Sequence, residues 1–242
     1  MSLIPLPSSL VPFLESYLPK DNDKIFVTLT YAQSLDSKIA AEKGVQTKLS
    51  HLETKTMTHY IRSKHDAILV GIGTVLADDP KLNCRYGDDG SKIRPVILDP
   101  KCLWNYEKST LYEICKSGQG LAPFIIIDES FTPTDNSEKA VNSQGGKYIK
   151  LPLIKHRKDN WGLILNKLYE LGIKSVMVEG GAQVINDLLL KPEFVDSLIV
   201  TIAPVYLGVN GVTVSPNSQT LLKDITWWTG IQDSVVAARL TS

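Results

Sequence analysis

Residues Asp66–Pro80 read Asp-Ala-Ile-Leu-Val-Gly-Ile-Gly-Thr-Val-Leu-Ala-Asp-Asp-Pro, and they say more about the architecture than any other segment. The apolar run Ala67–Gly71 predicts a short buried strand, and Gly73–Ala77 after it predicts a short helix or turn. Glycines without a Cβ, followed by the hydroxyl of Thr74, let a phosphate approach the backbone, although Thr74 is equally suited to cap a helix. The stretch therefore predicts a strand–helix unit with a candidate phosphate site at its turn.

On both sides of this unit, short apolar runs alternate with helical patterns. This alternation predicts an α/β fold with a largely parallel central sheet flanked by helices. Trp227–Ile231 and Val235–Leu240 follow each other without a helix, which predicts an antiparallel C-terminal hairpin, and we expect loops at Gly87–Lys92 and Asp128–Gly146. The remaining predicted elements are strands at Ile25–Ala32, Arg94–Leu98, Phe124–Asp128, Tyr148–Leu151, Ser175–Val178 and Leu198–Ile202, and helices at His51–Lys64 with Ser50 as N-cap, Trp161–Leu171 and Ala182–Leu190.

The length of 242 residues suits one large domain, and no linker-like stretch divides it. We expect a single domain over residues 25–242, preceded by an N-terminal arm over residues 1–24 that packs on its surface. Met1–Pro19 contains no Lys or Arg, so we expect neither a secretory signal nor a mitochondrial transit peptide.

Charge and cysteine content argue against several classes of protein. The 26 Lys and Arg residues balance 26 Asp and Glu residues, which is unlike a nucleic-acid binder or a polybasic membrane-surface protein. No apolar run approaches the roughly 20 residues that span a bilayer. The three cysteines, without CxxC spacing, are typical of a reducing compartment, so we expect a cytoplasmic protein.

Common catalytic motifs are missing from the sequence. It has no GxxxxGK[ST] phosphate loop, and Leu76 stands where a GxGxxG fingerprint needs its third glycine. The four histidines lack the i, i+4 or HxH spacing of a metal site, so we expect no metal. No GxSxG elbow for a nucleophilic serine occurs either.

The segment Val178–Ala182, Val-Glu-Gly-Gly-Ala, is a second candidate phosphate site. It ends a predicted strand and begins a predicted helix, whose free N–H groups favour an anion. A tight strand-to-helix turn without a ligand is the alternative. Two phosphate-compatible turns on one sheet indicate a ligand with several phosphates, and a dinucleotide fits that description.

Four segments, taken in chain order, resemble a known family: Tyr31–Ala40, Asp66–Pro80, Arg94–Asp99 and Val178–Ala182. They are similar to the reductase of riboflavin biosynthesis, whose family includes the C-terminal domain of the bacterial bifunctional deaminase-reductase. The resemblance extends over about residues 25–210 and implies a dihydrofolate reductase-like fold, NADPH as cofactor and a homodimer. The H-x-E and P-C-x-x-C signature of the zinc deaminase is absent, as in the stand-alone fungal or archaeal enzymes. The implied substrate is 2,5-diamino-6-ribosylamino-4(3H)-pyrimidinone 5′-phosphate.

The resemblance also implies roles for individual residues. Asp36, Lys38 and Glu179 are candidates for moving the proton, and the sequence does not choose among them. The run Lys155–Lys158 could supply a cation for the 2′-phosphate of NADPH, although a solvated loop is the favoured interpretation of that run. The implied cofactor residues are Ala32, Gly73, Thr74, Asp78, Leu153, Val178, Gly180, Gly181, Ala182 and Gln183, and the implied substrate residues are Arg62, Leu82, Arg85 and Glu179.

Three positions depart from the family pattern. Ser37 replaces a glycine, which costs roughly 1 kcal/mol if that residue has positive φ. Gln46 and Lys48 replace the Ser and Trp of bacterial relatives, so those contacts do not transfer.

Two other functions are weighed against the reductase. A dihydrofolate reductase proper shares the fold, but the Pro-Trp pair expected near its first loop is missing here. A non-catalytic nucleotide-binding module is the other alternative, and the presence of both Arg62 and Arg85 argues against it. Without the resemblance, both arginines would be interpreted as ordinary surface cations.

Overall fold

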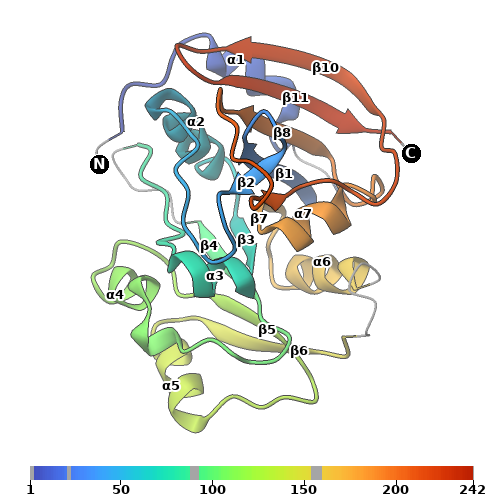
Figure 1. Ribbon diagram of the computed structural model, residues 1–242. Helices are drawn as coiled ribbons and strands as arrows, with labels where there is room; N and C mark the ends of the chain where they lie inside the picture. The colour runs from blue at the N-terminus through green and yellow to red at the C-terminus, as the bar shows by residue number, and fades with distance from the viewer. Residues whose placement is uncertain (1–2, 21–22, 88–92, 154–159, 242) are drawn as a thin grey trace.

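A mixed sheet forms the centre of the computed structural model, which describes residues 3–20, 23–87, 93–153 and 160–241 (Figure 1). Within these residues nine strands pair in the order β10-β11-β8-β1-β7-β3-β4-β5-β6. The strands are β1 Phe26–Gln33, β3 Ala67–Gly71, β4 Arg94–Leu98, β5 Phe124–Asp128, β6 Lys147–Leu151, β7 Ser175–Gly180, β8 Ser197–Ile202, β10 Leu222–Thr229 and β11 Ser234–Leu240.

The strands from β8 to β6 in this order are parallel, whereas β11 pairs antiparallel with both β8 and β10. The predicted α/β class, with a largely parallel sheet and an antiparallel C-terminal hairpin, is therefore confirmed. Strand β7 lies between β1 and β3, so that Val178 is in register with Leu29 on one side and Leu69 on the other. Strands β3 to β6 extend the sheet on one side of β7, whereas β1, β8 and the C-terminal hairpin lie on its other side. Open α/β sheets bind ligands where the order of strands switches in this way.

Helices cover both faces of the sheet. On one face, α6 (Trp161–Glu170) and α7 (Ala182–Leu188) pack against the side chains of Leu29 and Leu69. Ile68 points to the opposite face, because side chains alternate along a strand. On that face lie α1 (Leu10–Leu14), α2 (Leu52–Arg62), α4 (Thr110–Lys116) and α5 (Asp135–Ser143), with the 3₁₀ turns η1 (Glu15–Tyr17) and η2 (Tyr106–Lys108).

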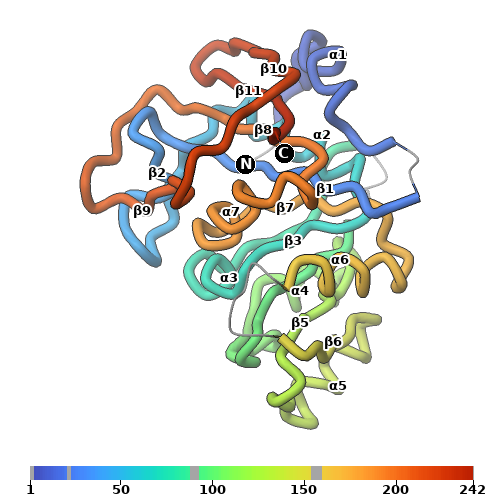
Figure 2. Tube along the Cα trace, turned by 90° about the vertical axis from the view of Figure 1, so that its right-hand side faces the viewer, coloured from blue at the N-terminus to red at the C-terminus, as the bar shows by residue number. Residues whose placement is uncertain are grey.

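A small ribbon stands apart from the main sheet. It consists of β2 (Lys38–Ala40) and β9 (Val212–Thr213), which pair antiparallel. Figure 2 shows it projecting beside α7 and α3 (Ile72–Asp78), on the side of the sheet where both helices begin. The ribbon therefore reaches toward the carboxyl ends of the parallel strands.

The start of α2 differs from the prediction. The helix begins at Leu52, and its N-cap is His51 rather than Ser50. The ring nitrogen Nδ1 of His51 accepts a hydrogen bond from the backbone N–H of Glu53 at 3.5 Å. Asp233, in the distant hairpin turn, accepts a hydrogen bond from the His51 backbone N–H at 2.7 Å, so a tertiary contact selects the cap.

The predicted loop Asp128–Gly146 was also wrong in part, because it contains α5. Thr134 caps this helix by accepting a hydrogen bond from the Ser137 backbone N–H, and Val141 is its buried residue. Ala140 and Val141 are the only apolar residues of α5, so the segment has the polar composition of a loop. Most of the predicted loop Gly87–Lys92 lies outside the described residues.

The N-terminal segment is part of a hydrophobic cluster. Leu10 and Leu14 are fully buried and pack with α2 and with Trp228 of the hairpin. The Trp228 indole N–H donates to Ser9 Oγ at 3.0 Å. The division into an arm over residues 1–24 and a domain over residues 25–242 stays a prediction. Among the described residues, no helix combines the length and apolarity needed to cross a bilayer.

A buried histidine joins β1 to the end of α2. The carbonyl of Ile61 can only accept, so His65 Nδ1 carries the proton and donates to it at 2.8 Å. Nε2 then accepts from the Thr28 hydroxyl, also at 2.8 Å. Burial lowers the pKa of His65 to about 4, so the ring is neutral at neutral pH.

Candidate functional site

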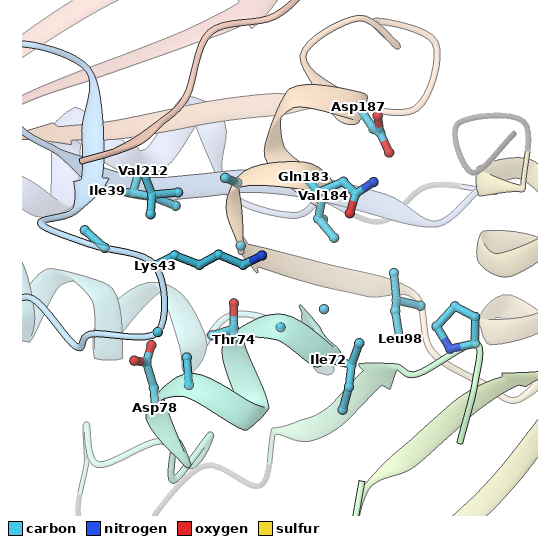
Figure 3. A pocket seen from close by; sticks show the side chains of 18 of the residues that line it. Ile39, Lys43, Ile72, Thr74, Asp78, Leu98, Gln183, Val184, Asp187 and Val212 are labelled. Atoms are coloured by element: carbon cyan, nitrogen blue, oxygen red, sulfur yellow. The ribbon is translucent and has the colours of Figure 1, made fainter. Parts of the chain in front are cut away.

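A cavity of about 690 Å³ lies where β3 and β7 end side by side and α3 and α7 begin (Figure 3). Gly71 is the N-cap of α3, and Gly181 is the N-cap of α7. The volume is in the range of small-molecule and cofactor sites. The walls comprise Gly71–Thr74, Ala77 and Asp78 of α3 and its turn, Gly181–Val184 and Asp187 of α7, residues 42–47, Ile39, Ala40, Val212, and an end made by Leu98, Pro100, Ile126, Leu153, Asn160, Trp161 and Ile164.

The two helix starts approach so closely that side chains would not fit between them. A Cβ at Gly181 would lie 2.9 Å from Thr74 Oγ1, and one at Gly71 would lie 3.2 Å from Val184 Cγ2. Gly180 has φ +111°, which a residue with a Cβ rarely adopts. The paired glycines therefore leave free backbone on the cavity wall, which is the arrangement that a phosphate group needs.

The adjacent carboxylates Asp78 and Asp79 do different things. Asp78 faces the cavity, and burial raises its pKa. Asp79 has φ +41° and ends α3. Its two oxygens accept from the Thr110 backbone N–H at 3.0 Å each, so Asp79 holds the start of α4. The two carboxylates are not arranged to share an ion.

Glu179, two residues before Gly181, forms a two-pronged ion pair with Arg62, and neither residue is among those that line the cavity. Arg62 Nε donates to Glu179 Oε1 at 2.7 Å, and Nη2 donates to Oε2 at 2.6 Å. A third bond runs from Arg62 Nη1 to the Asn83 carbonyl at 2.8 Å. The side chains are only 13% and 18% exposed, respectively. Burial by itself lowers the pKa of Arg62, but the charge and hydrogen bonds of Glu179 outweigh it and the pKa is raised.

Arg85, the second predicted substrate cation, packs against buried His59. The Arg85 backbone N–H donates to His59 Nδ1 at 3.2 Å, and Arg85 Nη2 lies 2.7 Å from Nε2. Burial, with the positive charges of Arg62, Arg85 and Lys55, lowers the pKa of His59 to about 3. The imidazole is therefore neutral, and the neighbourhood is cationic.

Asp36 and Lys38 are engaged outside the cavity. Asp36 accepts from Ser34 Oγ at 2.5 Å and from the backbone N–H groups of Leu207 and Gly208 at 3.0 and 2.8 Å. These bonds, the Ser34 hydroxyl first, lower the pKa of Asp36 to about 2. Lys38 Nζ donates to Thr213 Oγ1 at 2.5 Å across the ribbon. Asp36 thus connects its turn to the segment at Leu207 and Gly208, and Lys38 connects β2 to β9.

Ser37, which replaces a glycine of the family pattern, has φ +58°. The cost of roughly 1 kcal/mol expected for a serine with positive φ therefore applies. The Ser37 carbonyl accepts from the Val214 backbone N–H at 2.9 Å, which ties the turn to the segment after β9.

The structure brings together many of the residues predicted for the cofactor. Ala32 instead lies near the end of β1, and Gly180 is buried at the end of β7. Val178 and Leu82 are buried within hydrophobic clusters, which leaves Val178 only its backbone for a contact. Lys155–Lys158 lies outside the described residues. The assigned roles stay predictions, and the predicted residues that line the cavity are Gly73, Thr74, Asp78, Leu153, Gly181, Ala182 and Gln183.

Sequence reasoning missed two parts of the wall. Residues 42–47 have no periodicity and reach the cavity only because the ribbon carries them there. The apolar end, with Leu98, Ile126 and Trp161, belongs to three different elements. Leu98 and Ile126 lie near the carboxyl ends of their strands, and this position in the sequence would have predicted that they line a ligand site. No described group of three or more His, Cys, Asp or Glu residues is arranged to hold a metal ion.

Comparison with known proteins agrees with the resemblance. The family described as the RibD C-terminal domain matches residues 25–236. Two relatives bear the name 2,5-diamino-6-ribosylamino-4(3H)-pyrimidinone 5′-phosphate reductase. The protein from Debaryomyces hansenii is 60% identical, with all of both chains covered, and the protein from Saccharomyces cerevisiae is 46% identical, with 99% of each covered.

A solved structure is similar over nearly the whole chain. It is that of the riboflavin biosynthesis reductase from Saccharomyces cerevisiae, with a TM-score of 0.83 and 41% identity. The alignment covers 97% of this chain and 100% of the yeast chain. The family resemblance inferred from the motifs is thus confirmed: the chain belongs to the RibD C-terminal domain family and is an oxidoreductase.

Proposed function

We propose that this protein uses NADPH to reduce the ribosyl side chain of 2,5-diamino-6-ribosylamino-4(3H)-pyrimidinone 5′-phosphate to the ribitylamino product. The observation that carries the proposal is the glycine-lined approach of α3 and α7 on one cavity, together with the Arg62–Glu179 pair, whose Glu179 lies on β7, the strand that leads into α7. The names of full-length relatives supply the identity of the substrate.

The cavity fits a dinucleotide in chemistry as well as in size. Gly181, Ala182, Gln183 and Thr74 would hold the pyrophosphate, because a side chain at Gly181 would fill the space that a phosphate needs. The apolar end, with Leu98, Leu153 and Trp161, suits the adenine ring. When bound, the cofactor supplies the hydride, and the protein supplies position and charge.

The substrate would lie on the side of Arg62 and Arg85. We assign the 5′-phosphate chiefly to Arg85, whose Nη2 also lies 2.7 Å from His59 Nε2. Arg62 donates three hydrogen bonds to Glu179 and Asn83. Arg62 then acts by holding Glu179 in one orientation. The reaction needs the ribosylamine to open to an imine, whose C1′ accepts the hydride while the former ring oxygen accepts a proton.

Of the three predicted proton carriers, Glu179 remains the best placed. Asp36 has a pKa of about 2 and is a carboxylate at working pH, and Lys38 is bonded to Thr213. Glu179 lies at the carboxyl end of β7, just before the Gly180–Gly181 turn. We therefore propose that Glu179 orients the amino and hydroxyl groups of the substrate at the site of proton transfer.

An assay of NADPH oxidation tests the function. We expect turnover with the ribosylamino-pyrimidinone phosphate and none with dihydrofolate. Turnover with dihydrofolate alone would favour a dihydrofolate reductase. NADPH binding without turnover of either compound would favour a non-catalytic nucleotide-binding module.

We further propose a homodimer, formed through β10 in a cytoplasmic protein. β10 is an edge strand, and Leu221, Ile225 and Trp227 on or beside it are 59%, 49% and 62% exposed. An edge strand with such an apolar face is suited to pairing with a second copy. Sedimentation of wild type and Trp227→Ser tests this proposal, with the variant expected to shift toward the monomer. The three cysteines are free, which agrees with a reducing compartment.

A further inference from the structure

The loop after β2 is shaped into a defined turn at the mouth of the cavity. The Val45 backbone N–H donates to the Glu42 carbonyl at 3.3 Å, which closes a four-residue turn. Gly44 stands third in this turn with φ +82°, the value that a type II turn requires at that position. Thr47 Oγ1 accepts from the Ala41 backbone N–H at 2.8 Å and closes the base of the loop. Lys43 is therefore held at the corner of the turn.

The side chain of Lys43 extends from this corner into the cavity. Figure 3 shows it pointing into the space between Thr74 on α3 and Val184 on α7, across from Leu98. The charged residues among the described lining are Glu42, Lys43, Asp78 and Asp187, so Lys43 is the sole cation on that part of the wall. Within the described chain, its ammonium group makes no hydrogen bond or ion pair.

We propose that Lys43 is a cofactor-binding residue that contacts the pyrophosphate of the dinucleotide, an inference that rests on the proposed function. A pyrophosphate held at the Gly181 turn would carry two negative charges next to one backbone wall. An ammonium directed at the same space supplies the compensating positive charge from the opposite side. Contact with the 2′-phosphate fits less well, because that group belongs with the adenosine, at the apolar end near Leu98.

The test titrates NADPH and NADH separately into wild type, Lys43→Met, Lys43→Arg and Lys139→Met. Trp161 lines the cavity, so the quenching of its fluorescence reports binding without turnover. Lys139 is an exposed lysine on α5 and controls for the loss of one positive charge. We expect Lys43→Met to weaken both cofactors by the same factor, roughly 3- to 10-fold, with a shallower salt dependence. Lys43→Arg should stay within about twofold of wild type, and Lys139→Met should not change either dissociation constant.

Each other outcome overturns a specific statement. Unchanged affinity in Lys43→Met overturns the proposal. Weaker binding of NADPH with unchanged NADH also overturns it, because Lys43 would then contact the 2′-phosphate. Failure of the wild type to bind either cofactor would instead overturn the proposed function, and it would do so before any variant is compared.

Discussion

The Arg62–Glu179 pair can be broken from either side without a large change in volume, by Arg62→Met or by Glu179→Gln. Both charges are largely removed from water, with 13% and 18% of their side chains exposed. Removing one partner of a buried pair costs about 3–5 kcal/mol, because the other charge stays buried and uncompensated. Since each side chain keeps some contact with solvent, we expect each variant to lose about 2–4 kcal/mol of unfolding free energy. For a chain of this size, that corresponds to a Tm lower by roughly 4–16 °C.

Urea denaturation is the suitable assay, because urea leaves ionic interactions unscreened whereas guanidinium does not. Lys167→Met is the matched control, since it removes a lysine whose 2.9 Å bond to Glu170 lies on the surface, and it should change the free energy by less than about 0.5 kcal/mol. The double variant should lose less than the sum of the single losses, with a coupling energy of about 2 kcal/mol. The reasoning would be refuted if both single variants matched the control, or if their losses were additive.

Three further predictions concern the cofactor, pH and proton transfer. Gly181→Val should weaken NADPH binding at least 10-fold in a titration, because its Cβ would lie 2.9 Å from Thr74 Oγ1; unchanged affinity would contradict the glycine cradle. Burial lowers the pKa of His65 to about 4 from 6.5, so the folded state binds fewer protons than the unfolded state between these values. Stability is therefore lost as pH falls through this window, by about 2 kcal/mol from pH 7 to pH 5 for this group. In urea titrations, the loss of unfolding free energy between pH 7 and pH 5 should be smaller in His65→Gln than in wild type by about that amount. Asp36→Asn should leave the acidic limb of the kcat/KM profile where it is, because a carboxyl with a pKa of about 2 is not the proton donor; loss of that limb would restore Asp36 as a candidate.

The buried strands were predictable because their signal is local. Ala67–Gly71 and Phe124–Asp128 are apolar up to their last residues, Gly71 and Asp128, as expected of strands covered on both faces, and both match the structure residue for residue. Thr74 and Gly181 were found for a related reason: each stands within three residues of the end of such a strand, at the edge where α/β sheets bind ligands. Asp78, the last residue of α3, was assigned from the family resemblance.

The features that sequence reasoning missed depend on contacts between distant segments. His51 caps α2 because Asp233 holds its backbone, and Arg62 is paired with Glu179 by the packing of α2 beside β7. Lys43 reaches the cavity because β2 pairs with β9. None of these partners lies near the other in the chain, so no local pattern carries the information.

The position of β7 between β1 and β3 has a consequence for how the chain is assembled. During synthesis, β1 and β3 emerge long before β7, and until β7 arrives they have no shared neighbour. Helix α3 follows β3 and α7 follows β7, so the cavity between the two helices forms only after β7 has filled the gap between β1 and β3. A ligand that binds between α3 and α7 therefore stabilises the folded state of the entire sheet, because its site exists only when the sheet is complete. Cofactor binding should accordingly protect the complete chain from proteolysis, and a nascent chain that ends at β6 lacks α7 and the Gly181 turn, which form one wall of the cavity.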